Sequence, residues 1–132
     1  MLVEKARLAY KAVKSLEDFN RGIYWHRAEA LWKLKKDDLY QYVFGDDGLN
    51  SWKAFCQGAN IVPATASEKV KNYEFYIVKL GFSIKELTGL DGGCLYYLHR
   101  KYPEMERKEV EGWIVKLKSL SRNDFMEEIR CL

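Results

Sequence analysis

The chain has 132 residues, of which 48% are hydrophobic and 31% are charged, and these proportions are typical of a folded domain. This length predicts one domain with a hydrophobic core, without the disulfides or metals that shorter chains need. The formal net charge of +3 is compatible with an acidic partner but does not indicate one. We recognise no signal peptide and no apolar run of the roughly 18–20 residues that span a membrane.

The cysteines and histidines argue against a disulfide framework and against a metal site. Cys56, Cys94 and Cys131 are odd in number and widely spaced, which favours a reducing compartment and therefore a cytoplasmic protein. His26 and His99 lack neighbours at metal-ligand spacing. No nucleophile has a base and an orienting group beside it. We therefore expect no metal, no cofactor and no enzymatic activity.

Apolar residues recur every three or four positions over residues 2–19, which predicts a helix with one buried face. That face consists of Leu2, Ala6, Ala9, Val13 and Leu16. Gly22 tolerates left-handed backbone, so Asn20-Arg21-Gly22 is predicted to end this helix. A second helix is predicted over residues 23–36, with an apolar stripe formed by Tyr24, Ala28, Leu31 and Trp32. Its terminal lysines, Lys33, Lys35 and Lys36, suit a helix C-terminus, although contact with phosphate is an alternative explanation.

The remaining signals also predict helices separated by turns. Gly45 to Gly48 forms a turn signal, Ser51 or Asn50 can cap a helix, and Ser83 with Glu86 has the form of a capping box. A break at 91–93 precedes a helix over 94–101, Pro103 is predicted to open the next helix, and Ser121 or Asn123 to cap the last. The buried face of the helix after Pro103 is predicted to be Val110, Trp113, Ile114 and Leu117. No segment alternates with the period of a strand, so we predict an all-α, compact single domain of six to eight helices over residues 1–132.

Residues 51–80 carry the strongest functional pattern in the chain. A short helix signal, 51–57, runs into a break at 58–63, and a longer helix signal, 64–80, follows. Short helix, turn and longer helix form the outline of a helix-turn-helix, whose second helix can enter a DNA major groove. Ile61 is placed to fill the turn, and Ala66 is small where the two helices approach each other. The buried face of the second helix is predicted to be Ala66, Val70, Tyr73, Ile77 and Leu80.

With that face buried, the other side chains of the second helix are predicted to point away from the core. These are Ala64, Thr65, Ser67, Glu68, Lys71 and Phe75. Those in the first two turns would face base edges. Thr65, Ser67 and Lys71 would contact bases or the nearby backbone, and Lys53 and Lys69 would contact phosphate and set the register. The predicted DNA-contacting set is Lys53, Ala64, Thr65, Ser67, Glu68, Lys69 and Lys71.

The segment IVPATASEKVKNYEF at 61–75 resembles the pattern I-S-x-S-T-A-x-x-x-I-x-x-Y of helix-turn-helix proteins from phages and other mobile elements. The preceding stretch, 28–56, is similar to the upstream helices of these proteins, and LSRNDFMEEI at 120–129 is similar to a closing helix found in some of them. The resemblance implies a small transcriptional regulator that binds duplex DNA, as a possible homodimer on a two-fold site. One departure is that Ala64 and Glu68 stand where such proteins often carry Arg or Lys. Glutamate accepts only from cytosine and repels phosphate.

A second hypothesis is a protein-binding helical module. The weak donor content of the second helix and the richness in aromatic residues, 14% of the chain, motivate it, because Trp and Tyr are enriched at interfaces. The partner would be a host protein or nucleoprotein complex, with the chain acting as a viral inhibitor of host defence, as anti-CRISPR proteins do. An exposed patch of Phe75, Tyr76, Tyr96 and Tyr97 would favour this hypothesis. The four tryptophans, Trp25, Trp32, Trp52 and Trp113, are otherwise expected in the core.

Overall fold

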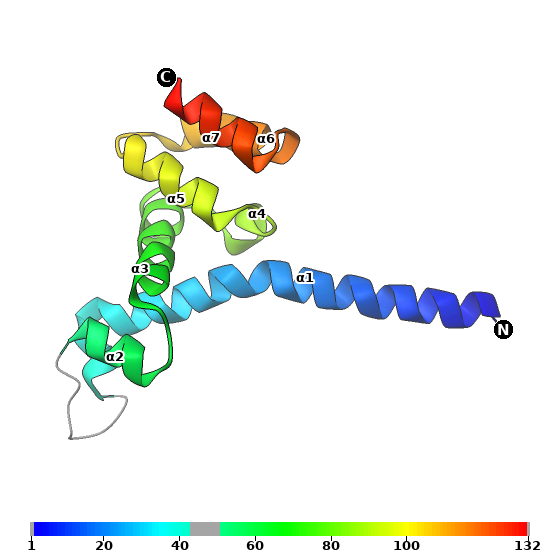
Figure 1. Cartoon of the computed structure of the whole chain (residues 1–132), viewed down its shortest axis with the longest axis horizontal. Helices are drawn as coiled ribbons and strands as arrows, with labels where there is room; N and C mark the ends of the chain where they lie inside the picture. Colours follow the sequence, from blue (N-terminus) through cyan, green and yellow to red (C-terminus); the bar gives the residue numbers. More distant parts are fainter. Residues whose placement is uncertain (1, 43–50, 132) are drawn as a thin grey trace.

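The computed structural model describes residues 2–42 and 51–131, and within them the side chains other than those of 14–21 and 42. The predicted all-α class is confirmed, because these residues form helices and include no strand (Figure 1). In chain order the helices are α1 (Leu2–Lys35), the 3-10 helix η1 (Lys36–Tyr42), α2 (Trp52–Gly58), α3 (Pro63–Asn72), the π-helix η3 (Tyr73–Lys79), α4 (Ile84–Leu87), α5 (Gly92–Lys101), α6 (Arg107–Ser119) and α7 (Arg122–Arg130). Counting α3 and its continuation η3 as one gives eight helices in the described residues.

The first helix continues through the position where the sequence predicted its end. α1 is a single helix of 34 residues, and Gly22 lies inside it without the left-handed backbone seen at Gly81 and Gly89. The predicted C-cap at Asn20-Arg21-Gly22 is therefore wrong. A glycine inside a helix costs only about 1 kcal/mol relative to alanine, and packing of the half that follows Gly22 offsets a penalty of that size.

The start of α1 forms an arm, defined here as residues 2–13, that extends away from the rest of the molecule (Figure 1). All of its side chains are exposed, including Leu2 at 84% and Val13 at 52%. The predicted burial of Leu2, Ala6, Ala9 and Val13 is therefore wrong, and the side chain of Leu16 lies outside the description. Helical periodicity was read correctly, but no other described element lies beside the arm to cover its apolar row (Figure 1).

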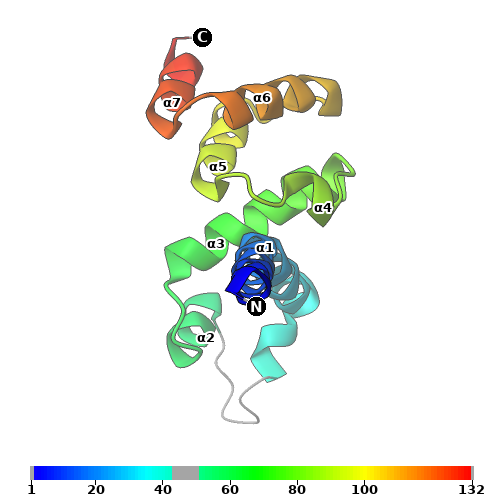
Figure 2. The same cartoon turned by 90° about the vertical axis from the view of Figure 1, so that its right-hand side faces the viewer.

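Helix α3 runs across α1 and connects two hydrophobic cores (Figure 2). The smaller core joins α1, η1, α2 and α3 through Leu31, Tyr40, Phe55, Cys56, Ala66 and Val70. The larger core joins α1 and the α3–η3 helix to the four later helices, and Trp25 is fully buried in it. The Trp25 indole N–H donates to the carbonyl of Leu87 at 3.1 Å. Trp32, Trp52 and Trp113 are half-buried and pack against these cores.

Most predicted helix starts are confirmed by side-chain caps. Ser51, Ser83 and Ser121 each accept a hydrogen bond from a backbone N–H in the first turn of the helix that follows, and Glu86 completes the capping box with Ser83. The predicted buried face of α6 is confirmed, with Val110 and Ile114 buried and the other two partly buried. The predicted turn at Gly45 to Gly48, and Asn50, lie outside the described residues.

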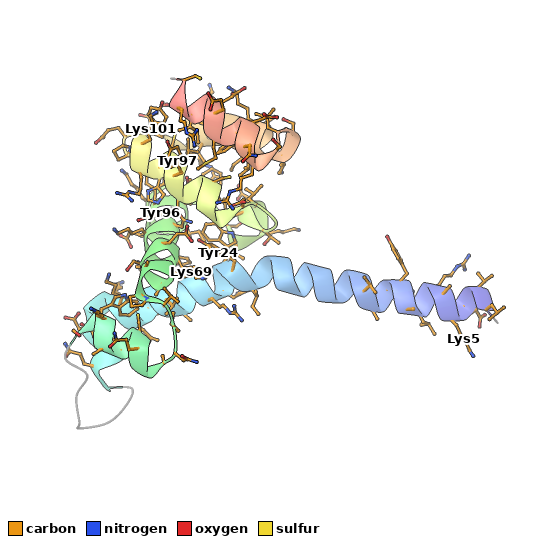
Figure 3. The ribbon with its side chains drawn as sticks, in the orientation of Figure 1. Lys5, Tyr24, Lys69, Tyr96, Tyr97 and Lys101 are labelled. Carbon is orange, nitrogen blue, oxygen red and sulfur yellow. The ribbon has the colours of Figure 1, made fainter. Side chains whose placement is uncertain are left out.

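Two predicted starts are displaced. α5 begins at Gly92 rather than Cys94, because the Asp91 side chain accepts from the Cys94 N–H and caps the helix two residues earlier than predicted. The prediction that Pro103 opens the following helix is wrong, since α6 begins at Arg107. Met105 is buried between them, so the Pro103 segment remains a turn that anchors a core side chain. At the end of α5, the Lys101 ammonium donates to the carbonyl of Ile129 at 2.9 Å, which joins α5 to α7 (Figure 3).

Candidate functional site

The segment from α2 to α3 is a pair of helices joined by a tight turn. Asn60 adopts a left-handed conformation with φ of 61°, which asparagine tolerates better than most residues. The Ile61 N–H then donates to the carbonyl of Cys56 at 2.8 Å, while the Ile61 side chain packs against the smaller core. This is the hydrogen-bond and apolar pattern that ends many helices, with asparagine in the usual place of glycine. Pro63 opens α3, where its missing N–H has no cost.

The predicted buried face of the second helix is confirmed, with Ile77 and Leu80 partly buried against the larger core, but the buried side is wider than predicted. Ala66, Val70 and Tyr73 are buried as predicted, but Phe75 is buried too, so its predicted outward position is wrong. The helix changes from α to π geometry at Tyr73, and the wider turn rotates the later side chains relative to a 3.6-residue period. As a result Phe75 and the neighbouring Tyr76 both enter the larger core.

The same rotation removes the exposed aromatic patch predicted for the protein-binding hypothesis. Phe75 and Tyr76 are buried, and Tyr96 and Tyr97 are only half exposed (Figure 3). The Tyr76 hydroxyl donates to the carbonyl of Leu95 at 2.5 Å, and burial raises the pKa of this tyrosine above its usual range. Tyr76 and Phe75 therefore join the α3–η3 helix to α5, through Leu95 and His99, and the four aromatic residues do not form one open surface.

The seven predicted DNA-contacting residues separate into two groups. Lys53, Ala64, Thr65 and Lys71 are exposed, whereas Ser67, Glu68 and Lys69 are half-buried. The Lys69 ammonium lies 5.2 Å from the centre of the Tyr24 ring (Figure 3), and burial lowers the pKa of Lys69. The pKa of Tyr24 is raised, first by burial and further by the carboxylate of Glu68. Lys69 and Glu68 thus contact α1, and the structure does not bring them together with Lys71.

Beside Lys71 lies a groove with a volume of about 690 Å³, which we call the basic groove. Its walls come from the end of α1, the start of η1, the α3–η3 helix and α5. The lining residues are Trp32, Lys35, Lys36, Val70, Lys71, Glu74, Phe75, Val78, Lys79 and His99. Four lysines therefore surround a largely apolar floor that contains a single carboxylate.

Three of the four lysines that line the basic groove lie against aromatic rings. The ammonium of Lys36 lies 4.9 Å from the centre of the Trp32 ring, and that of Lys79 lies 5.4 Å from the centre of the Phe75 ring. Lys35 is similarly placed, 5.2 Å from the Trp52 ring. Such contacts are worth about 0.5–1 kcal/mol at exposed sites. They orient the ammonium groups without neutralising them, so the positive charge remains available to an anion.

The acidic and imidazole groups of the groove do not cancel this charge. Glu74 accepts a short hydrogen bond from the Trp32 indole N–H, which fixes its carboxylate at the wall. His99 is 8% exposed and its ring stacks on Phe75 with the centres 4.9 Å apart. Burial, with smaller contributions from Lys71 and another nearby cation, lowers the pKa of His99 to about 4. The imidazole is therefore neutral near pH 7 and belongs to the apolar floor.

Sequence reasoning missed most of the basic groove. Lys35 and Lys36 were explained first by the helix dipole, with phosphate contact as the alternative, and Lys79 was assigned no role. One signal was present, because Ser67, Lys71, Glu74 and Val78 follow at spacings of four, three and four, which places them in one row of a helix. The row therefore joins Ser67 and Lys71, which were predicted to contact DNA, to Glu74 and Val78, which line the groove.

Other constellations give no site in the described residues. No group of three or more His, Cys, Asp or Glu side chains in residues 2–42 and 51–131 is placed to hold a metal ion. Cys94 is buried and its pKa is raised to about 11, mainly by burial, so its thiol is protonated and a poor nucleophile near pH 7. No helix of the described chain combines the length and the apolar character that a membrane crossing requires.

Comparison of the chain with protein-family models, with curated proteins and with solved structures gave no match in any of the three searches.

Proposed function

We propose that this protein binds duplex DNA through the exposed start of α3, as a small regulator of a phage or another mobile element. One observation carries the proposal. Ala64, Thr65 and Lys71 are exposed on α3, and Lys71 also lines a groove with three further lysines. A helix that presents small polar side chains beside a positively charged flank suits insertion into the major groove between two phosphate strands.

Within this proposal the exposed side chains have distinct roles. The hydroxyls of Thr65 and Ser67 can donate to or accept from base edges, and the methyl of Ala64 can contact a thymine methyl. Lys53 and Lys71 contact phosphate, which positions α3 but carries no sequence information. Glu68, predicted to face base edges, and Lys69, predicted to contact phosphate, are left out of the proposed DNA contacts, because both face Tyr24 of α1.

The wider setting is also part of the proposal. The protein acts in the cytoplasm, without a cofactor and without catalysing a reaction, and two copies bind a two-fold operator. The arm of α1 is the surface on which two copies would meet, since its exposed Leu2, Tyr10 and Val13 are otherwise uncovered.

The base-reading role is tested by selecting preferred duplexes from a random pool with the wild type and with the Thr65→Ala/Ser67→Ala double variant. We expect the wild type to enrich a defined site and the double variant to bind duplex DNA with a weakened or altered preference, because phosphate contacts remain. Alanine favours helical backbone more than serine or threonine does, so both substitutions should preserve α3, as circular dichroism would verify. An unchanged preferred site would contradict base reading by α3.

A second candidate function is a protein-binding module, such as a viral inhibitor of a host defence complex. The observation that favours it is the arm, where Leu2, Val3, Leu8, Tyr10 and Val13 are exposed, because exposed apolar surfaces mark protein interfaces. A stable complex with a host protein that persists when DNA is digested, and that is lost on deletion of residues 1–13, would support this function over the first.

A further inference from the structure

We propose that the basic groove binds the phosphodiester backbone of DNA. The end of α1 and the η3 helix would then contact one DNA strand next to the bases read by α3. This inference rests on the proposed function and extends it to Lys79, which the sequence left without a role, and to Lys35 and Lys36, for which the sequence left phosphate contact as an alternative. The occupant is a sugar-phosphate strand, identified by the charge and shape of the groove.

Charge complementarity is the first argument. The four lysines that line the groove face a single carboxylate, that of Glu74, and this group is engaged by Trp32. His99 is neutral near pH 7 because of its burial. Glu74 can offset only one of the four lysine charges, so the lining keeps a net positive charge. Among the described residues no ion pair joins these four lysines to a carboxylate, so an incoming anion has no such pair to break.

The spacing of the cations is the second argument. Lys71 and Lys79 lie eight positions apart on the continuous α3–η3 helix. The α-helical rise of about 1.5 Å per residue puts an upper limit of about 12 Å on the separation of their backbones along the helix axis, because the π-helical part rises less per residue. A DNA strand carries one charge for every nucleotide, so a strand that runs along the groove presents more than one phosphate over this distance. Lysines distributed along a groove match a linear polyanion, whereas a single small anion would need them to converge on one point.

The apolar floor is the third argument. Val70, Phe75 and Val78 contribute to the lining, and Val78 is itself exposed. Deoxyribose presents apolar carbon atoms beside each phosphate, so a strand can cover this floor while its phosphates meet the surrounding ammonium groups. The Lys79 ammonium also donates to the carbonyl of Pro103 at 3.3 Å. Its contact with the Phe75 ring, 5.4 Å from the ring centre, places it at the floor before the strand arrives.

The test measures how the affinity for a fixed duplex depends on salt. For duplex DNA, the slope of log K against log salt concentration changes by about 0.9 for each phosphate contact. We expect Lys35→Gln/Lys36→Gln and Lys79→Gln to reduce the steepness of this slope by about 0.9 per lysine removed. Lys108→Gln, an exposed lysine of α6 outside the groove, is the matched control and should leave the slope unchanged.

The outcomes separate this inference from the proposed function. If the groove variants keep the wild-type slope while Thr65→Ala/Ser67→Ala loses its preferred site, α3 reads DNA and the groove assignment is overturned. If the groove variants flatten the slope and the double variant keeps its site, the groove assignment stands and base reading by α3 fails. A wild type that does not bind duplex DNA overturns both. Competition by poly-glutamate as effective as competition by DNA would also overturn the phosphodiester assignment, in favour of an acidic protein.

Discussion

At the scale of single residues, a buried polar contact fixes how the elements around the candidate site meet. The fully buried Asn72 of α3 donates from its side-chain nitrogen to the Tyr24 hydroxyl at 2.8 Å and to the Gly92 carbonyl at 2.9 Å. Three elements, α1, α3 and α5, are therefore joined through one amide. Buried polar groups that lose such partners cost about 1–3 kcal/mol, so this contact strongly favours one orientation of α3 across α1.

Substituting alanine for glycine is predicted to change the free energy of unfolding in opposite directions at two helical positions, Gly92 and Gly112. A Cβ at Gly92 would lie 2.6 Å from the Tyr24 hydroxyl oxygen, so Gly92→Ala must displace Tyr24 and should lower the free energy of unfolding by about 1–3 kcal/mol. A Cβ at Gly112 would have nothing within 4 Å, so Gly112→Ala should raise it by about 0.5–1 kcal/mol. Urea denaturation measures both. Equal effects of the two substitutions would show that Gly92 does not pack against Tyr24.

The buried His99 is predicted to make stability depend on pH. Its pKa is lowered from 6.5 in the unfolded chain to about 4 in the fold, so the unfolded chain takes up the proton first. The neutral His99 therefore contributes its full share to the free energy of unfolding above about pH 6.5, and this contribution is lost as the pH falls toward about 4. Between about pH 7 and about pH 5, the loss should be on the order of 2 kcal/mol. Comparing urea denaturation of the wild type and His99→Gln isolates this contribution, and an identical pH dependence of the two proteins would contradict it.

At the scale of elements, local chemistry predicted helix starts better than helix ends or burial. Ser51, Ser83 and Ser121 are caps as predicted, because a hydroxyl that accepts a first-turn N–H acts within three residues. The predicted helix end at Gly22 and the predicted exposure of Phe75 were wrong because neither depends on local sequence alone. Whether a glycine ends a helix, or a helix changes to π geometry, depends on packing with α3 and α5 that no local pattern contains.

The arm is predicted to contribute little to the stability of the monomer. Residues 2–13 are exposed, so their removal takes away little buried apolar surface. Deletion of residues 1–13 should therefore change the free energy of unfolding by less than about 1 kcal/mol, as measured by urea denaturation of dilute protein. A much larger loss would mean that the arm is covered in solution, and a loss that grows with protein concentration would identify a second copy as the cover.

At the scale of the whole molecule, the candidate site combines parts that the sequence predicted with parts that it did not. Thr65 and Lys71 were assigned from the helix-turn-helix pattern, and both are exposed. Lys36 and Lys79 are separated by more than forty residues, and only the crossing of α1 by α3 places them around one groove (Figures 1 and 2). A single sequence specifies helical faces well, but it does not specify which faces cross, so the groove became evident only in the fold.

The central claim is that this molecule binds duplex DNA with Lys71 at the contact. The most direct test is a titration of the wild type and Lys71→Glu against random-sequence duplex DNA at about 50 mM and about 200 mM salt, a range over which several phosphate contacts weaken binding by orders of magnitude. We predict binding of the wild type that weakens steeply with salt, and loss of binding by Lys71→Glu with an unchanged helical circular dichroism spectrum. Absence of wild-type binding at the lower salt concentration, or equal affinity of the two proteins, would contradict the claim.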